Sequence, residues 1–261
     1  MNKKFKHETK EIAMYKTTFF TTDTMDTLLP TKKKYLDSFT FNETLTIEMA
    51  EFSYERMKKH RKLVQNNIES LLKQKNLNKC FSLTEFHEFK NRLIERGEKH
   101  DLSKFLEPEK LAYVYINWKH RVKKDHKEDL KIAYEYPTEM VQEINKAIHH
   151  HWQVNSHHAA FHCFKEDNTL EDNKEKIKQL LEKMTSLDLM EMVADWIAMN
   201  QEYKGNCKEH AEKNIGDDKK WPFSEEQKTK IFTLIDLLEP APQVINELSC
   251  QPESASIQLG R

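Results

Sequence analysis

The chain of 261 residues contains little that interrupts helices, because only 4 residues are glycine and 7 are proline. Charged residues make up 33% of the chain, and the mean hydropathy is −0.84. This composition is typical of a helix-rich protein and argues against a sheet-rich one. A chain of this length can bury a sizeable core as one large domain, with or without appendages. We therefore predict an all-α fold.

Other absences exclude whole classes of protein. There is no run of about 18 apolar residues, so no membrane span is expected, and the formal net charge of −1 gives no basic field for nucleic acid. Residues 1–16 are basic but lack a signal-peptide apolar stretch. No Cys-x-x-Cys motif occurs, which suits free thiols in a reducing cytosol. The widely spaced cysteines are Cys80, Cys163, Cys207 and Cys250. We expect a cytoplasmic protein.

Apolar periodicity divides the chain into three parts. Residues 1–43 are rich in threonine and lysine without a sustained period, which predicts a partly ordered N-terminal extension. Residues 44–240 form the predicted helical domain, and residues 241–261 a tail. Helix-start signals and apolar stripes predict seven helices in the domain. They are expected near residues 45–75, 82–97, 107–122, 137–152, 173–184, 185–203 and 224–239.

Histidines gather in the stretch "IHHHWQVNSHHAAFH", residues 148–162. A local tract of this kind can simply be a solvated surface. Helical geometry favours at least one inward imidazole, because Val141, Ile144 and Ile148 define a buried face on which His151 also falls. A lone inward histidine is more often a hydrogen-bonded core residue than a ligand. His60, on the edge of the apolar stripe of the first long helix, has the same two interpretations.

Asp195 is harder to explain as a structural residue. It lies in "LDLMEMVADWIAM", where apolar residues surround the helix on nearly every side. An ionised carboxylate there costs several kcal/mol unless a cation, a metal or hydrogen bonds compensate it. The alternatives to a metal are a buried pair with a basic residue and a cap for a neighbouring helix. Asp188 and Glu191 share its face, and we expect them to be solvent-facing acids at the helix start rather than supports for a site.

The dipeptide His100-Asp101 means little alone, but the chain supplies partners for it. His60, the His100-Asp101 pair, an inward histidine of the 150–158 tract and Asp195 come from four separate helical segments. Imidazole and carboxylate are the ligands of Mn, Fe, Co, Ni and Zn, and a helical bundle can project them into one core site. We predict a divalent transition metal, as one or two ions. Lys104 lies one helical turn from Asp101 and could face an anionic substrate.

Three motifs in this order resemble a known group. They are His100-Asp101-Leu102-Ser103-Lys104-Phe105; then His150-His151-Trp152 with Asn155 and His157-His158; and finally Leu189, Glu191-Met192 and Asp195-Trp196. The order resembles the HD-domain metal phosphohydrolase superfamily, and more closely an uncharacterised HD-like family of unknown function among phage and bacterial proteins. The resemblance covers about residues 50–240. The chain departs from that family in lacking a proline after the paired histidines and in its first 43 residues.

The resemblance implies an HD-like helical bundle with a mono- or dinuclear metal centre. Its four core ligands would be His60, His100, Asp101 and Asp195. One or two of the histidines at 150, 151, 157 and 158 would be additional ligands, and the candidates we name for these positions are His151, His157 and His158.

The leading functional hypothesis is a metal-dependent phosphohydrolase acting on a nucleotide or another small phosphorylated metabolite. Asp101 and Lys104 would be its catalytic residues, Lys104 by neutralising phosphoryl charge. A solvent-exposed lysine is the alternative for Lys104. A dinuclear iron oxygenase is the second hypothesis, and a non-catalytic nucleotide- or protein-binding module the third.

Few other features point to partners. The short basic stretches "TKKKY" and "MKKHRK" are more simply solvated surface than a nucleic-acid site. The tryptophans at 118, 152, 196 and 221 are expected to be core anchors. The substrate and the oligomeric state have no readable signature.

Overall fold

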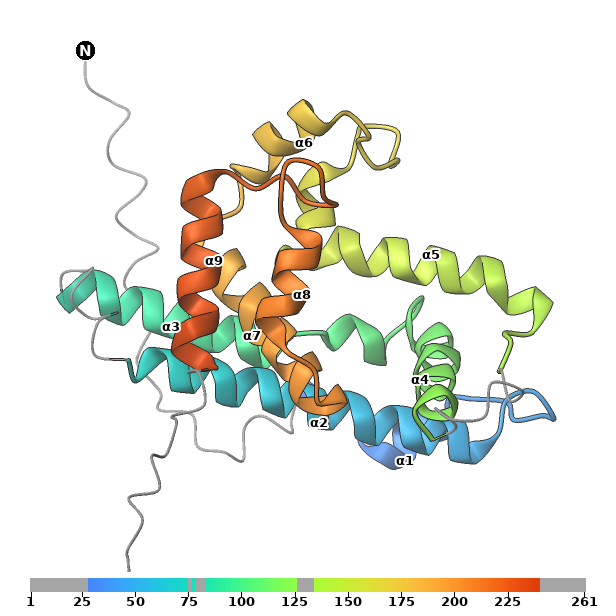
Figure 1. Cartoon of the computed structure of the whole chain (residues 1–261). Coiled ribbons are helices and arrows are strands. Elements are labelled where there is room, and N and C mark those ends of the chain that lie inside the picture. Colours follow the sequence, from blue (N-terminus) through green and yellow to red (C-terminus); the bar gives the residue numbers. More distant parts are fainter. Residues whose placement is uncertain (1–27, 75–76, 78–82, 126–133, 240–261) are drawn as a thin grey trace, which may run out of the picture.

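The computed structural model confirms the all-α fold. It describes residues 28–74, 77, 83–125 and 134–239 (Figure 1). In this part of the chain the extended pairings are two isolated bridges, Phe164–Leu170 and Ile215–Trp221. The helices are α1 Lys32–Leu36, α2 Ile47–Leu72, α3 Leu83–Lys99, α4 Lys110–Asp125, α5 Thr138–Val154, α6 Lys174–Leu181, α7 Ser186–Tyr203, α8 Cys207–Asn214 and α9 Glu225–Leu238, with 3-10 turns η4 Leu102–Phe105 and η5 Ala159–Cys163.

Side-chain caps explain several of the helix starts. The Thr46 side chain accepts a hydrogen bond from the backbone of Met49 at the start of α2. Capping boxes open α7 at Thr185 and α9 at Ser224. In each, the capping side chain accepts from the backbone N–H three residues on, and the side chain there accepts from the backbone N–H of the capping residue. All seven predicted helices are present. The short elements α1, α8, η4 and η5 were not predicted.

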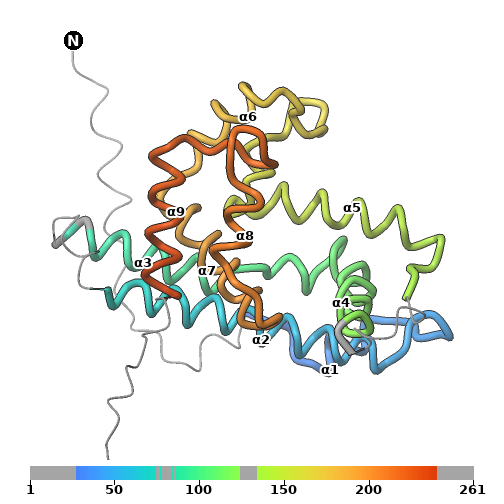
Figure 2. Tube along the Cα trace, in the orientation of Figure 1, coloured from blue at the N-terminus to red at the C-terminus, as the bar shows by residue number. Residues whose placement is uncertain are grey.

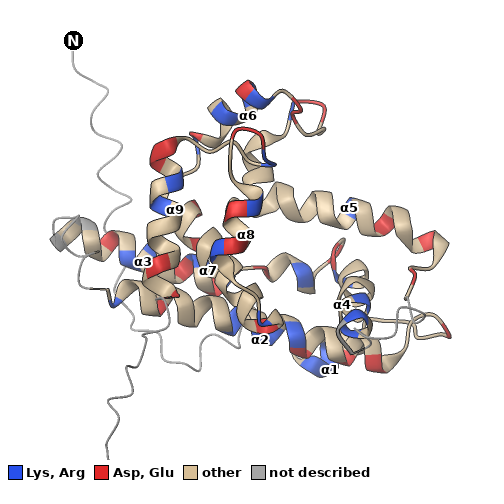
Figure 3. Cartoon of the chain, in the orientation of Figure 1, with Lys and Arg blue, Asp and Glu red and all other residues tan. Residues whose placement is uncertain are grey.

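Helix α2 is the axis of the fold. It packs against α1, α3, α4, α7 and α9, and Figures 1 and 2 show it as the long helix that runs through the lower part of the view. Among the described helices, none combines the length and the apolar character that a membrane crossing requires. Figure 3 shows acidic and basic residues interspersed over the helices.

Two apolar cores lie along α2. The first is mostly aliphatic and joins the C-terminal half of α2 to α7 and α9 through residues such as Val64, Ile68 and Ile197. The second is rich in aromatic residues and joins the N-terminal half of α2 to α1, α4 and α5. In it Tyr54 meets the Phe105 ring edge-on, with 5.7 Å between centroids. Each fully buried large side chain stabilises the fold by about 1.5–3 kcal/mol.

The described part of the predicted N-terminal extension is built into the second core. Leu29 and Tyr35 are buried there, and the Tyr54 hydroxyl donates to the carbonyl of Pro30, 2.9 Å away. Residues 28–43 therefore pack on the domain rather than standing apart from it. Residues 1–27 of the extension and the predicted tail at 241–261 lie outside the described residues.

The buried face of α5 differs from the prediction in one residue. Val141 is 43% exposed, whereas Met140, Ile144 and Ala147 are buried. The face follows spacings of four, three and four residues, which turn Val141 outward and still place His151 inward. His151 is accordingly buried.

Candidate metal centre

The predicted ligands come together between the two cores. Helix α2 supplies His60, and the end of α3 leads directly into His100 and Asp101. The last turn of α5 supplies His151, the link to η5 supplies His157 and His158, and α7 supplies Asp195. All seven fall into groups whose donor atoms lie within 4.8 Å of one another, as a metal ion requires. These groups could hold a metal ion.

Asp101 lies at the junction of two such groups. Its backbone is left-handed, with φ 56° and ψ 21°, a conformation that aspartate tolerates better than most residues. This turn ends α3 and directs the carboxylate inward, where it is 3% exposed. Its Oδ1 lies 3.3 Å from His151 Nε2 and 3.9 Å from His157 Nε2. Its Oδ2 lies 3.5 Å from His100 Nε2 and 3.9 Å from His60 Nε2.

One group, the helix half-site, consists of His60, His100 and Asp195. Asp195 Oδ1 lies 2.9 Å from His60 Nε2 and 3.7 Å from His100 Nε2. The other, the loop half-site, consists of His151, His157 and His158 together with Asp101. There the Nε2 atoms of His151 and His158 face each other at 2.8 Å. Two imidazole nitrogens this close share at most one proton or bind a common cation.

An outer layer of acids fixes the histidine rings. Glu191 Oε1 lies 2.9 Å from His100 Nδ1 and 3.1 Å from His157 Nδ1. Because hydrogen bonds to both histidines hold the pKa of Glu191 below its usual range against the effect of burial, it stays ionised and the Nδ1–H groups donate. Glu109 Oε2 lies 2.9 Å from His151 Nδ1. The Nε2 atoms are thereby aimed at Asp101, which is the usual arrangement around metal-binding histidines.

Three inward atoms of this cluster have no hydrogen-bond partner among the described residues. They are His100 Nε2, His157 Nε2 and Asp101 Oδ1, all buried. Leaving a buried polar atom unsatisfied costs roughly 1–3 kcal/mol. Two nitrogen donors and one carboxylate oxygen, all pointing to one region, are the donor set of a transition-metal site. The residues present therefore fit a metal ion.

A third geometric group, His100, His157 and Glu191, is explained without a metal. Both oxygens of Glu191 are engaged: Oε1 by the two histidines and Oε2 by Arg96 Nε at 2.6 Å. Arg96 also donates to Asp188 Oδ1 at 2.7 Å. Glu191 therefore acts as an orienting group.

The electrostatics of the cluster favour ligand forms of the side chains. Burial raises the pKa values of Asp101 and Asp195, but the neighbouring histidines outweigh it, so both values lie well below the usual range. Burial and nearby cationic groups lower the pKa values of His151 and His158. Ionised carboxylates and neutral imidazoles are the protonation states that bind metal. His100 differs: burial lowers its pKa, but Asp101, Asp195 and Glu191 together raise it to about 10.

Lys104 is directed at the centre rather than at solvent. Its ammonium group contacts Asp101 Oδ2 and lies 4.8 Å from the centroid of the Tyr113 ring. The side chain is 18% exposed. The interpretation of Lys104 as a solvent-exposed lysine is therefore wrong.

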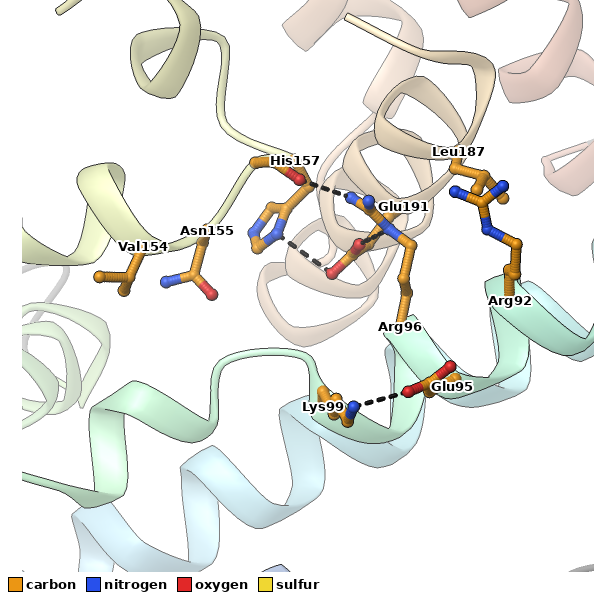
Figure 4. Close-up of a pocket in the computed structure, with 10 residues that line it drawn as sticks. Arg92, Glu95, Arg96, Lys99, Val154, Asn155, His157, Leu187 and Glu191 are labelled. Carbon is orange, nitrogen blue, oxygen red and sulfur yellow. Dashed lines mark hydrogen bonds and ion pairs between the residues drawn. The ribbon is translucent and has the colours of Figure 1, made fainter. Parts of the chain in front are cut away.

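A pocket of about 350 Å³ reaches the outer side of the centre. Figure 4 shows Glu191 between His157 and Arg96, with Lys99 paired to Glu95 on α3. Two of the three basic residues that line this pocket, Arg96 and Lys99, are thus already paired with acidic residues.

The expectation that Asp188 and Glu191 face solvent is wrong. Asp188 is 3% and Glu191 4% exposed; Asp188 completes the capping box of α7 and accepts from Ser156 and Arg96. Glu191 precedes Asp195 by four residues, a helical spacing that places both on one face and signals its role. The sequence around Glu109 is that of an ordinary acidic residue at the start of a helix, and no spacing to a predicted ligand indicates its role.

Not every histidine of the tract joins the centre. His149 is exposed and stacks near Trp152, with 5.7 Å between ring centroids. His150 binds the second oxygen of Glu109 at 2.7 Å, and His162 contacts the carbonyl of Ser156 at 3.0 Å.

Comparison with protein families matches residues 49–237 to a family of unknown function, DUF5662. The match spans most of the chain, so the chain belongs to this family. No curated protein and no solved structure matches it.

Proposed function

We propose that this member of the DUF5662 family is a metal-dependent phosphohydrolase that acts on a nucleotide or another small phosphorylated metabolite. The observation that carries the proposal is the convergence of five imidazoles and Asp195 around the Asp101 carboxylate. Two adjacent groups that meet at one carboxylate suit two ions, and nitrogen and oxygen donors suit Mn, Fe, Co, Ni or Zn. The relationship to HD-domain enzymes, supported by motif order, belongs to the same proposal.

The residues around the centre serve such a reaction in defined ways. A divalent ion would supply Lewis acidity and a hydroxide nucleophile near neutral pH. Glu191 and Glu109 hold the histidine rings in place. Lys104, in contact with Asp101, brings a positive charge beside the site, where it can offset charge that develops on a phosphoryl group. Burial of the ligands keeps bulk water from competing for them.

Elemental analysis of the purified chain, followed by a phosphatase screen over nucleoside monophosphates and diphosphates, tests the proposal. We expect one or two transition-metal ions per chain and phosphate release that depends on them. The Asp101→Asn variant should lose both. A chain that binds none of these metals, or a metal-loaded chain that releases no phosphate from any substrate in the screen, would contradict it.

A second candidate is a dinuclear iron oxygenase. The specific observation in its favour is the imidazole-rich pair of half-sites meeting at a carboxylate, an arrangement that suits two irons equally well. Two irons with visible-range absorbance, and oxygen uptake instead of phosphate release, would favour this reaction. A metal-free chain that retains a ligand without turnover would favour a binding module.

A cytoplasmic location is part of the proposal. Cys163 and Cys207 are buried free thiols, which suits a reducing compartment. Cys80 and Cys250 lie outside the described residues.

A further inference from the structure

A second pocket, of about 180 Å³, lies beside the loop half-site and is lined by tryptophan. Trp152 from the end of α5, Trp196 from α7 and Trp221 from the segment after α8 contribute to its wall. We call it the tryptophan pocket. Three of the four tryptophans of the chain therefore gather at one place, and all three are only partly buried. The fourth, Trp118, packs edge-on against Phe52 in another part of the fold.

The clustering corrects the expectation that these tryptophans are only core anchors. Trp196 and Trp221 do pack against the first core, but each also lines the pocket. Partly exposed aromatic side chains that line a cavity offer surfaces on which a planar ring can stack. The volume is below the range of about 300–1,000 Å³ typical of pockets for whole drug-sized ligands, so it suits one ring system of a larger ligand.

The tryptophan pocket and the metal site share two residues. His157 and His158 line the pocket and are also members of the loop half-site. His157 is 2% exposed, and its Nε2 has no hydrogen-bond partner among the described residues. A ligand seated against the tryptophans would therefore contact the residues that hold the ion.

The remaining lining residues indicate the charge and polarity of the ligand. Lys220 Nζ lies 5.1 Å from the centroid of the Trp221 ring and 5.8 Å from that of Trp152. A cation already on these rings disfavours a cationic guest and favours one that carries negative charge. Asn214 and His210 add hydrogen-bonding groups that could pair with the edge of a nitrogenous ring.

We propose that the tryptophan pocket binds the nucleobase of a nucleoside phosphate, with the phosphate toward Lys220 and the metal centre. This inference rests on the proposed function and narrows its substrate class from phosphorylated metabolites to nucleotides. The ring stacks on tryptophan, while the charged part of the ligand meets the lysine and the ions.

Tryptophan fluorescence of the full chain is the direct test, because the pocket contains most of the fluorophores. We expect nucleoside monophosphates, and more weakly nucleosides, to quench the emission saturably, whereas ribose 5-phosphate does not. Trp221→Ala should weaken binding about 5- to 150-fold, the range for removal of one base-stacking aromatic. Trp118→Phe, in the second core, is the matched control and should leave the dissociation constant unchanged. Absence of saturable quenching by any of the four common nucleoside monophosphates at millimolar concentration would overturn the proposal.

Because Trp221→Ala removes a partly buried ring, an exposed position provides a second variant. Because Lys220 is exposed, Lys220→Glu should leave the fold intact. It should weaken nucleotide binding much more than nucleoside binding, because only the nucleotide carries phosphate. Equal binding of nucleotides by Lys220→Glu and the parent chain would contradict the placement of the phosphate.

The Asp101→Asn variant separates this proposal from the proposed function. Suppose that nucleosides still quench the fluorescence of Asp101→Asn, and that the parent chain shows no metal-dependent turnover. That result would support the nucleobase pocket and contradict the proposed hydrolase. Suppose instead that nucleotides do not bind, and that the parent chain hydrolyses sugar phosphates at rates that Trp221→Ala leaves unchanged. That result would support the hydrolase and contradict the nucleobase pocket.

Discussion

The helix half-site and the loop half-site contain the same ligand types but are held in different ways. His60 and Asp195 project from the interiors of α2 and α7, two helices that pack on each other, so core packing fixes them. His157 and His158 lie on a short link between α5 and η5. Contacts between His151 and Glu109 and between His157 and Glu191, in which the carboxylates accept, take the place of helix packing there. The comparison indicates that the loop half-site depends more on its supporting residues.

The two half-sites also differ in charge. His100, in the helix half-site, has three carboxylates around it and its pKa is raised to about 10. His151 and His158, in the loop half-site, have pKa values lowered well below the ordinary one, first by burial and then by nearby cationic groups. The metal-free chain thus presents a protonated His100 on one side and the neutral imidazoles of His151 and His158 on the other.

The largest effect is expected from Asp101→Asn, because this carboxylate contacts both half-sites. Asparagine tolerates the left-handed backbone at this position, so the change removes charge without adding strain. We expect metal affinity to fall by more than about 100-fold, beyond the range for outer residues, as measured by calorimetric titration. Asp218→Asn, at an exposed position, is the control. Loss of only one ion from a two-ion chain would show that Asp101 serves a single half-site.

A smaller effect is expected when the outer acids are changed. Glu191→Gln replaces the carboxylate that supports one histidine of each half-site by a neutral amide. Glu109→Gln makes the same change beside His151, the one half-site histidine that Glu109 contacts. We expect metal affinity to fall about 10- to 100-fold, in both half-sites for Glu191→Gln and in the loop half-site only for Glu109→Gln. Metal titrations of the two variants, followed ion by ion, make the comparison. Identical metal-titration curves for the two variants would contradict the proposal that Glu191 supports both half-sites and Glu109 only the loop half-site.

Metal uptake should depend on pH in a way that separates the half-sites. Below pH about 10 His100 carries a proton in the metal-free chain, and an ion must displace it. Affinity at the helix half-site should therefore rise with pH, by up to about tenfold per unit for one displaced proton. His151 and His158 are already neutral near pH 7, so the loop half-site should change little.

Calorimetry at pH 7.5 in buffers of different ionisation enthalpy counts the released protons. The variants His158→Asn and Asp195→Asn each leave one half-site intact, the helix and the loop half-site respectively. We expect about one proton per ion from the helix half-site and fewer from the loop half-site. Release of more protons per ion from the loop half-site than from the helix half-site would contradict the proposed difference in charge.

The smallest effect is expected at His149, which shares the histidine tract but is exposed on α5. His149→Ala should leave metal content and affinity within error of the parent chain, whereas His151→Ala, two residues away, should lose the ion of the loop half-site. Elemental analysis of the two variants side by side makes the measurement. A loss of metal in both would indicate that the tract binds metal as a surface cluster.

Much of this arrangement could be predicted because it follows from helical periodicity. The apolar helix around Asp195 and the seven-residue spacing, two helical turns, from Ile144 to His151 indicate inward side chains, and all seven predicted ligands do converge. The orienting role of Glu109 could not be predicted, because it depends on how the start of α4 packs against the end of α5. The packing of Tyr35 into the second core likewise depends on contacts between segments distant in sequence, which periodicity does not encode.

The most direct test of the metal centre is a crystal structure of the manganese-loaded chain with an anomalous difference map. We predict anomalous density beside the Asp101 carboxylate, with ions coordinated by the Nε2 atoms of His100 and His157 and with Glu191 still on their Nδ1 atoms. Density only at surface carboxylates, or an unliganded cluster in which these nitrogens turn to other partners, would contradict the account.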